Sequence, residues 1–97
     1  MARKTIIWSS KASDKFDYYF RWYLENARLE IANKFTATIY NAIDTIADNP
    51  YVGRRVETNP NAREYVIRKF PFLIFYTIDE KVNIVNIATI IHAKMKR

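Results

Sequence analysis

Apolar residues recur with helical spacing in two long stretches of the first half of the chain. The first set falls at i, i+3, i+4, i+7 and i+8 and comprises Phe16, Tyr19, Phe20, Tyr23 and Leu24. This spacing lines one face of a helix. Ser9 or Ser10 offers a hydroxyl that can accept a hydrogen bond from the free amides at the helix start, and Glu25-Asn26 marks the expected end.

The second stretch steps by four, four, three and four residues along Ile31, Phe35, Ile39, Ala42 and Ile46. This pattern predicts a longer helix that stops near Asp48-Asn49-Pro50, because Pro50 disfavours helical geometry at the residue before it. Two amphipathic helices with a short joint predict an antiparallel helix pair.

Extended segments lie on both sides of the helices. Thr5–Trp8 is short and rich in β-branched residues, which is typical of a strand. After the helices, residues 64–69 alternate between apolar and polar. Phe72–Ile78 is almost continuously apolar, which predicts a central strand covered on both faces. Val82–Ile91 is apolar on both sides towards its end and predicts a last, interior strand.

Residues 50–62, between the second helix and these strands, indicate a loop that exposes Arg54 and Arg55. The segment holds the only glycine, Gly53, and the run Asn59-Pro60-Asn61, which is typical of a turn. The element order is then β-α-α-β-β-β. We predict one α+β domain over residues 1–97, with an antiparallel helix pair packed on a small, twisted, mainly antiparallel sheet.

Composition excludes several kinds of site. The chain of 97 residues has no cysteine, one histidine and one glycine. Thiolate chemistry, a multi-histidine metal site, a P-loop and a dinucleotide-binding loop are therefore excluded within the chain. We expect no metal and no cofactor. Neither a signal peptide nor a membrane-spanning stretch is visible, so we expect a cytoplasmic protein without membrane contact.

Positive charge is concentrated in the second half of the chain. The formal net charge is +6; residues 1–49 carry seven Lys or Arg and six acids, whereas residues 50–97 carry nine and four. Such a field attracts nucleic acid or an acidic protein through long-range, salt-sensitive forces. A basic surface without a specific partner is the simpler alternative.

Several segments, each weak alone, share a characteristic order and spacing. They are Trp8-Ser9-Ser10-Lys11-Ala12, Ile43–Pro50 with Val52-Gly53-Arg54-Arg55, Arg63-Glu64-Tyr65-Val66-Ile67, Phe72–Asp79, Val85-Asn86-Ile87 and Ile90-Ile91-His92. Together they resemble the RelE/ParE family of bacterial toxins over nearly the whole chain.

Membership of this family implies the toxin half of a type II toxin–antitoxin system, of the kind associated with plasmid stabilisation. Such a toxin is neutralised by a cognate acidic antitoxin, whose extended, partly helical segment wraps the toxin and often adds to its sheet. Some members cut messenger RNA on the ribosome, as mRNA interferases. The ParE-like branch instead blocks DNA gyrase. Because both branches share one fold, the fold does not decide between them.

A ribonuclease of this family works without metal. It needs a base for the ribose 2′-OH, an acid for the leaving oxygen and cations for the charge that builds on the phosphate. The candidates are Arg63, Arg68, Lys69, His92 and Lys94. His92 has a suitable pKa for proton transfer, although a hydrogen bond that shapes the strand end is the alternative role. Ribonuclease members generally carry a tyrosine or histidine close to the C-terminus, and no tyrosine follows His92.

The missing tyrosine and the two long helices favour the ParE-like reading, in which the toxin inhibits DNA gyrase by protein–protein contact and is not an enzyme. The residues expected to contact partners are Arg54, Arg55, Tyr65, Lys94, Lys96 and Arg97; a solvated loop and tail would also explain these cations. A degenerate toxin that only binds its antitoxin is a third reading. The sequence leaves open whether a homodimer or a toxin–antitoxin hetero-oligomer forms.

Two aromatic residues, Tyr18 and Trp22, lie off the apolar stripe of the first helix. Because large exposed aromatics are enriched at interfaces, they predict a surface patch for the antitoxin or for a second copy of the chain. The stripe itself is better explained as core than as a platform for base stacking.

Overall fold

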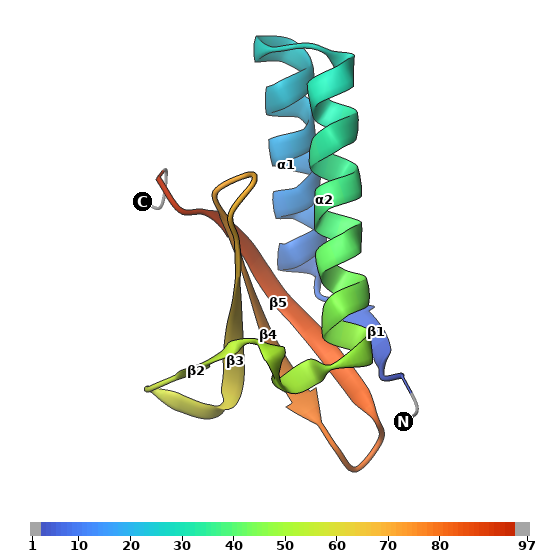
Figure 1. Ribbon diagram of the computed structural model, residues 1–97, viewed down its shortest axis with the longest axis vertical. Helices are drawn as coiled ribbons and strands as arrows, with labels where there is room; N and C mark the ends of the chain where they lie inside the picture. Colours follow the sequence, from blue (N-terminus) through green and yellow to red (C-terminus); the bar gives the residue numbers. More distant parts are fainter. Residues whose placement is uncertain (1–2, 95–97) are drawn as a thin grey trace.

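The computed structural model describes residues 3–94. Helix α1 (Ser10–Asn26) and helix α2 (Leu29–Asp48) form an antiparallel pair on one side of a five-stranded sheet (Figure 1). Ser9 caps α1, since its Oγ accepts a hydrogen bond from the Ala12 amide at 3.0 Å. The predicted ends of both helices are confirmed.

The sheet has the strand order β1-β5-β4-β3-β2. Its strands are β1 (Thr5–Trp8), β2 (Arg54–Val56), β3 (Asn59–Ile67), β4 (Phe72–Asp79) and β5 (Ile84–His92). β1 runs parallel to β5, and all other neighbours are antiparallel. The predicted α+β fold with a mainly antiparallel sheet is confirmed, and β5 lies in the interior of the sheet as expected.

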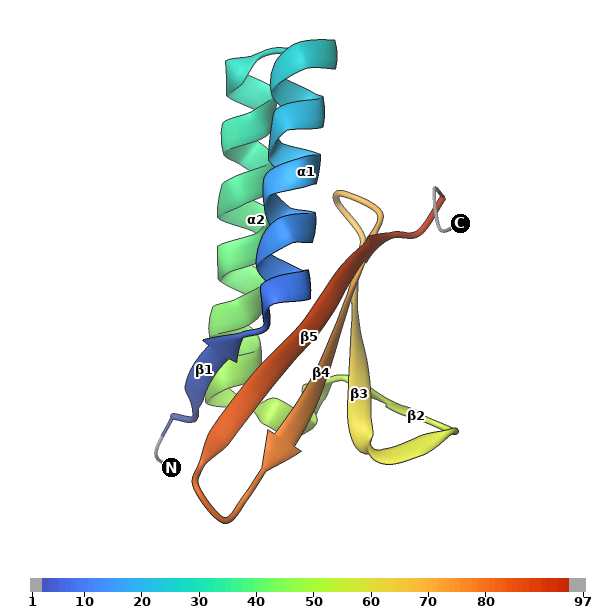
Figure 2. The ribbon, with the colours of Figure 1, turned by 180° about the vertical axis from the view of Figure 1, so that it is seen from behind.

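The core lies between the helix pair and one face of the sheet. Its large, fully buried side chains come from α2, β4 and β5: Phe35, Ile39, Ile46, Phe72, Ile74, Tyr76, Val85, Ile87 and Ile90. The expected α1 stripe packs against them, with one exception. Leu24 is 43% exposed, because the last turns of α1 extend past the sheet (Figure 2).

The prediction of a loop over residues 50–62 is wrong. The segment forms a 3-10 turn, η1 (Pro50–Val52), then β2 and the start of β3. Asn59 does make a turn-type bond, because its Oδ1 accepts from the Asn61 amide at 3.0 Å. The chain nevertheless stays paired across a bulge that follows Arg55. Pro60 is tolerated because β3 first pairs with β4 at Ala62, so Pro60 lies in the two-stranded tip.

The prediction that β4 is covered on both faces is also wrong. Phe72, Ile74 and Tyr76 are buried against the helices, whereas Leu73 and Phe75 on the other face are only half-buried. The register sets Leu73 beside Val66 on one side and Ile91 on the other. Cross-strand contact on an open face, rather than a second covering layer, therefore explains the continuous apolar run.

Candidate functional site

A groove runs along the part of β3 that β2 leaves unpaired. β2 pairs with Arg63 and Glu64, but β3 continues to Ile67 with only β4 beside it in the described sheet. We call Tyr65, Val66, Ile67, Arg68 and Lys69 the β3 groove. A hollow of about 390 Å³ separates them from Thr38, Asn41 and Thr45 of α2. A second hollow of about 390 Å³ lies towards Val52, Arg54 and Leu73.

The β3 groove combines cations with apolar surface. Arg68 and Lys69 are exposed at its end, and Val66 is 40% exposed within it. Arg54 borders the groove and forms an ion pair with Glu64, which offsets part of its charge. An unpaired strand edge offers backbone donors and acceptors to another extended chain. The arrangement therefore suits an extended segment that carries acidic and apolar residues.

The segment that carries Arg54 and Arg55 is held by one phenol from the central strand. The Tyr76 hydroxyl donates to the Pro50 carbonyl at 2.7 Å and accepts from the Gly53 amide at 3.0 Å. Burial raises the pKa of this phenol. A Cβ on Gly53 would lie 2.5 Å from the Tyr76 oxygen and 2.9 Å from the Glu64 carbonyl oxygen. Glycine is therefore required here by close approach.

Arg63, a candidate catalytic cation, forms hydrogen bonds with the same segment. Its guanidinium donates to the Gly53 carbonyl at 2.8 Å and to the Tyr51 carbonyl at 3.3 Å. The guanidinium carbon also lies 5.0 Å from the centre of the Tyr51 ring, within range of a cation–π contact. These contacts tie Arg63 to η1 and to Gly53 directly after it, away from the end of the sheet where the other candidates lie.

His92 lies at the end of β5 and is packed on the core. Its ring meets Phe72 edge-on at a centroid distance of 4.9 Å. Its backbone amide donates to the Tyr19 hydroxyl at 3.1 Å, and its Nδ1 accepts from the Lys94 amide at 3.1 Å. Burial, followed by the nearby charge of Lys94, lowers the pKa of the imidazole. These contacts match the role in shaping the strand end.

Four of the five catalytic candidates nevertheless share one end of the sheet. Ile67, Phe72 and His92 are register partners across three strands, so the Ile67 backbone lies roughly 10 Å from that of His92, two strand spacings away. Arg68 and Lys69 follow Ile67 directly in the chain. Lys94 comes just after His92, and the neighbouring Ala93 amide donates to the Pro71 carbonyl at 2.6 Å. This anchors the end of β5 to the β3–β4 turn.

The remaining partner-binding candidates are spread over the molecule. Arg55 is exposed on β2, Tyr65 lines the β3 groove, and Lys96 and Arg97 lie outside the described residues. Sequence reasoning missed Tyr76 and Tyr51. A signal for Tyr76 was a hydroxyl within an otherwise apolar strand, since a buried phenol needs a hydrogen-bond partner.

Within residues 3–94, no three His, Asp or Glu side chains gather as metal ligands. Neither described helix combines the length and apolar character needed to cross a bilayer.

The chain matches one family model along almost its whole length. The model describes the "ParE toxin of type II toxin-antitoxin system, parDE", and the match covers residues 6–97. The chain belongs to the ParE toxin family. The RelE/ParE resemblance of the sequence is thereby confirmed.

Individual relatives agree with this membership. "Putative toxin Y4kP" of Sinorhizobium fredii is 33% identical over 95 residues, which are 96% of this chain and 92% of the relative. The chromosomal ParDE system of P. aeruginosa has a TM-score of 0.76 at 21% identity, covering 91% of this chain and 94% of that chain. The RelBE2 toxin–antitoxin complex of Mycobacterium tuberculosis has a TM-score of 0.66 at 17% identity, and the likeness covers 95% of this chain and 93% of that chain. These two likenesses show a shared fold.

Proposed function

We propose that this ParE-family chain arrests growth in the cytoplasm by binding and inhibiting DNA gyrase, and that a cognate antitoxin neutralises it. The observation that carries the proposal is the family match over residues 6–97. The ParE-like branch of the family, as the sequence resemblance implies, acts on gyrase by protein–protein contact. The solved relative with the higher TM-score is also a ParDE system.

The site geometry supports binding rather than proton transfer. Arg63 is engaged by the carbonyls of Tyr51 and Gly53, and the His92 ring packs on Phe72 with Nδ1 already accepting a hydrogen bond. By contrast, Arg55, Arg68 and Lys69 are exposed and available to an acidic surface.

The β3 groove is the proposed antitoxin site. Arg68 and Lys69 would attract an acidic segment, and the unpaired edge of Tyr65–Ile67 would receive its backbone. We expect complex formation to weaken as salt rises, because exposed charges are screened. The substitutions Arg68→Glu and Lys69→Glu together should weaken the complex, whereas Lys34→Glu on the exposed side of α2 should not. Affinity that is equal at low and high salt would contradict a mainly electrostatic contact.

A supercoiling assay with purified toxin tests the main proposal. We expect a dose-dependent loss of gyrase supercoiling, reversed by the product of the neighbouring antitoxin gene. No inhibition at a large molar excess over gyrase would reject gyrase as the target. Induced cells should filament as replication stalls, rather than stop translation first.

A metal-independent, ribosome-dependent ribonuclease is the second candidate. The observation in its favour is the gathering of Arg68, Lys69, His92 and Lys94 at one end of the sheet. In that reading the cations would hold phosphate and His92 would move the proton. Primer extension on messenger RNA after induction tests it. Arrested growth without new cleavage sites would exclude this mechanism.

A further inference from the structure

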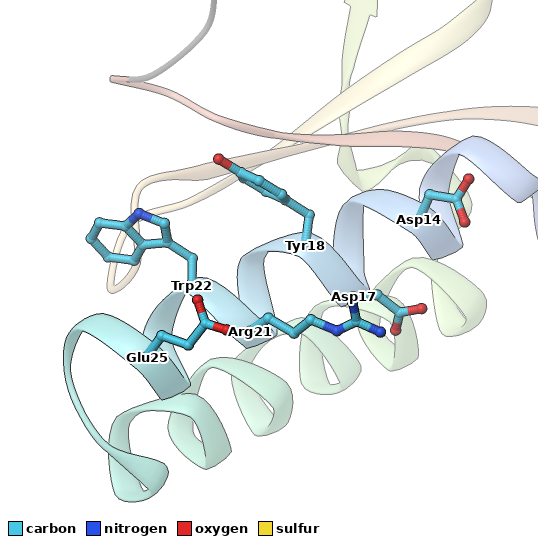
Figure 3. Close-up of a pocket in the computed structure, with 6 residues that line it drawn as sticks. All are labelled: Asp14, Asp17, Tyr18, Arg21, Trp22 and Glu25. Carbon is cyan, nitrogen blue, oxygen red and sulfur yellow. The ribbon is translucent and has the colours of Figure 1, made fainter.

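Helix α1 carries a second stripe of residues on the side away from the core. Tyr18 and Trp22 in this stripe are 58% and 39% exposed. They line a surface hollow of about 390 Å³ together with Asp14, Asp17, Arg21 and Glu25. Figure 3 shows the two aromatic side chains next to each other, with Asp14 towards the start of the helix and Glu25 towards its end.

The two exposed rings contact neighbours that are buried (Tyr19) or partly buried (Tyr23). Tyr18 meets Tyr19 edge-on at a centroid distance of 5.3 Å, and Trp22 meets Tyr23 edge-on at 5.4 Å. Tyr19 and Tyr23 in turn pack on Phe72 in the core. Because these ring contacts restrict the rotamers of Tyr18 and Trp22, covering the two side chains costs less side-chain entropy. Exposed aromatics of this kind mark a protein interface.

Two pairs of oppositely charged residues flank Tyr18 on this stripe. Lys11 precedes Tyr18 by seven residues and Glu25 follows it by seven; Asp14 precedes it by four and Arg21 follows it by three. These spacings place all four side chains near the same helix face as Tyr18. Lys11 and Glu25, of opposite charge, are therefore equidistant from Tyr18, and Asp14 and Arg21, also of opposite charge, are equidistant to within one residue.

A twofold axis through Tyr18 converts this pattern into complementary contacts. When two copies of α1 lie antiparallel, Lys11 faces the partner's Glu25, and Arg21 faces the partner's Asp14. The two Tyr18 rings meet at the centre, and Trp22 lies over the partner's hollow. A self-complementary patch of this kind is what a twofold homodimer requires. We propose that the exposed stripe of α1 is a homodimer contact between two copies of this chain.

Charge favours a second copy over another occupant. The ion pairs among the described residues use acids outside this stripe, namely Asp44, Asp48, Glu80, Glu30 and Glu64. The stripe charges are therefore available to a partner. A purely basic segment would suit Asp14 and Glu25 but would be repelled by Lys11 and Arg21. A second α1 satisfies both signs at once.

The small area of the α1 stripe limits the expected affinity of the dimer. α1 has 17 residues and is about 25 Å long at 1.5 Å per residue. One face of one helix is smaller than the total of about 1,600 Å² buried in a standard stable interface. The dimer should therefore be weak and reversible, form at high protein concentration, and dissociate as salt rises.

Sedimentation velocity on the full chain tests the proposal at low ionic strength, from low micromolar to near-millimolar concentration. We expect a monomer–dimer equilibrium in the unmodified protein. Arg21→Asp sets two acids opposite each other, and Asp14→Arg sets two guanidinium groups opposite each other. Each single variant should associate about tenfold more weakly or not at all. Lys34→Asp, which makes the same change of net charge as Arg21→Asp but on the exposed face of α2, should dimerise as the unmodified protein does.

Mixing the two α1 variants provides the decisive measurement. In the heterodimer, the aspartate at position 21 faces the arginine at position 14, and the original Asp14 faces the original Arg21. An equimolar mixture should therefore recover the dimer that neither variant forms alone. Both substituted side chains are exposed, and circular dichroism verifies that the helices remain. A monomer at every concentration, undiminished dimers of both single variants, or a mixture that stays monomeric would each overturn the proposal.

Discussion

The Tyr76 hydroxyl lies 3.0 Å from the Gly53 amide nitrogen and accepts its hydrogen bond. The same oxygen donates to the Pro50 carbonyl at 2.7 Å. One phenol thus satisfies a buried donor and a buried acceptor on the segment between α2 and β2. The central strand thereby fixes the position of Arg54 and Arg55.

Removing this hydroxyl should destabilise the protein. Tyr76→Phe leaves the Gly53 amide and the Pro50 carbonyl without their partner, and each unsatisfied buried group costs about 1–3 kcal/mol. Urea denaturation should show a lower free energy of unfolding, and hydrogen exchange should show faster exchange at Gly53. Tyr65→Phe is the matched control, since no hydrogen bond of the Tyr65 hydroxyl occurs among the described residues. Equal stability of the two variants would contradict the linking role of Tyr76.

Arg63 should behave as a structural residue. Arg63→Met keeps an apolar stem but loses the bonds to the Tyr51 and Gly53 carbonyls, at a cost of about 1–2 kcal/mol. For a domain of this size, 1 kcal/mol lowers the melting temperature by roughly 4–8 °C. Arg55→Met, at the exposed position paired with Arg63, should leave the melting temperature almost unchanged. A thermal scan in which Arg63→Met melts no lower than Arg55→Met would refute this role.

His92 should make stability depend on pH near neutrality. Burial and Lys94 lower the pKa of the folded imidazole below its ordinary 6.5, so the unfolded chain takes up the proton first as pH falls. The His92 contribution is therefore complete above about pH 6.5 and is lost below it, down to the folded pKa. NMR titration of the ring should give a midpoint below 6.5. His92→Gln should flatten the stability profile between about pH 7.5 and 5.5. A midpoint at or above 6.5 would contradict the prediction.

Thr89 offers a stabilising substitution. Its side-chain oxygen is buried and has no hydrogen-bond partner among the described residues. Thr89→Val keeps the shape and removes the unsatisfied hydroxyl, so the free energy of unfolding should rise by about 1 kcal/mol. Thr77→Val, at a half-buried position on the same strand pair, is the control and should change stability less. A Thr89→Val protein that unfolds at lower urea would show that the hydroxyl has a partner after all.

The helices and most strands could be predicted because their residues repeat with a regular period. The spacing from Ile31 to Ile46 predicts α2, and Pro50 predicts where it ends. β2 was missed because three residues, two of them exposed, carry no periodic signal. Leu24 was misplaced because periodicity locates a helix face but not the length of sheet beneath it.

The sequence indicates which residues are candidates for the site, but it does not predict all of their positions in the fold. Tyr65, Arg68 and Lys69 were expected near one strand and do line one groove. The contacts of Arg63 depend on carbonyls of η1, and those of His92 depend on Tyr19 and Phe72, which are distant in sequence. Such contacts depend on tertiary packing, which no local pattern encodes.

The parallel pairing of β1 with β5 has a consequence for how the chain folds. Contacts at this seam join residues as far apart as Lys4 and Asn83, a separation of 79 positions, whereas β3, β4 and β5 are joined by short turns. Closing so long a loop is entropically slow compared with forming hairpins. We therefore expect β1 to pair with β5 last during folding. Until it does, one side of β5 remains unpaired, and during that interval a neighbouring chain can insert its own first strand instead.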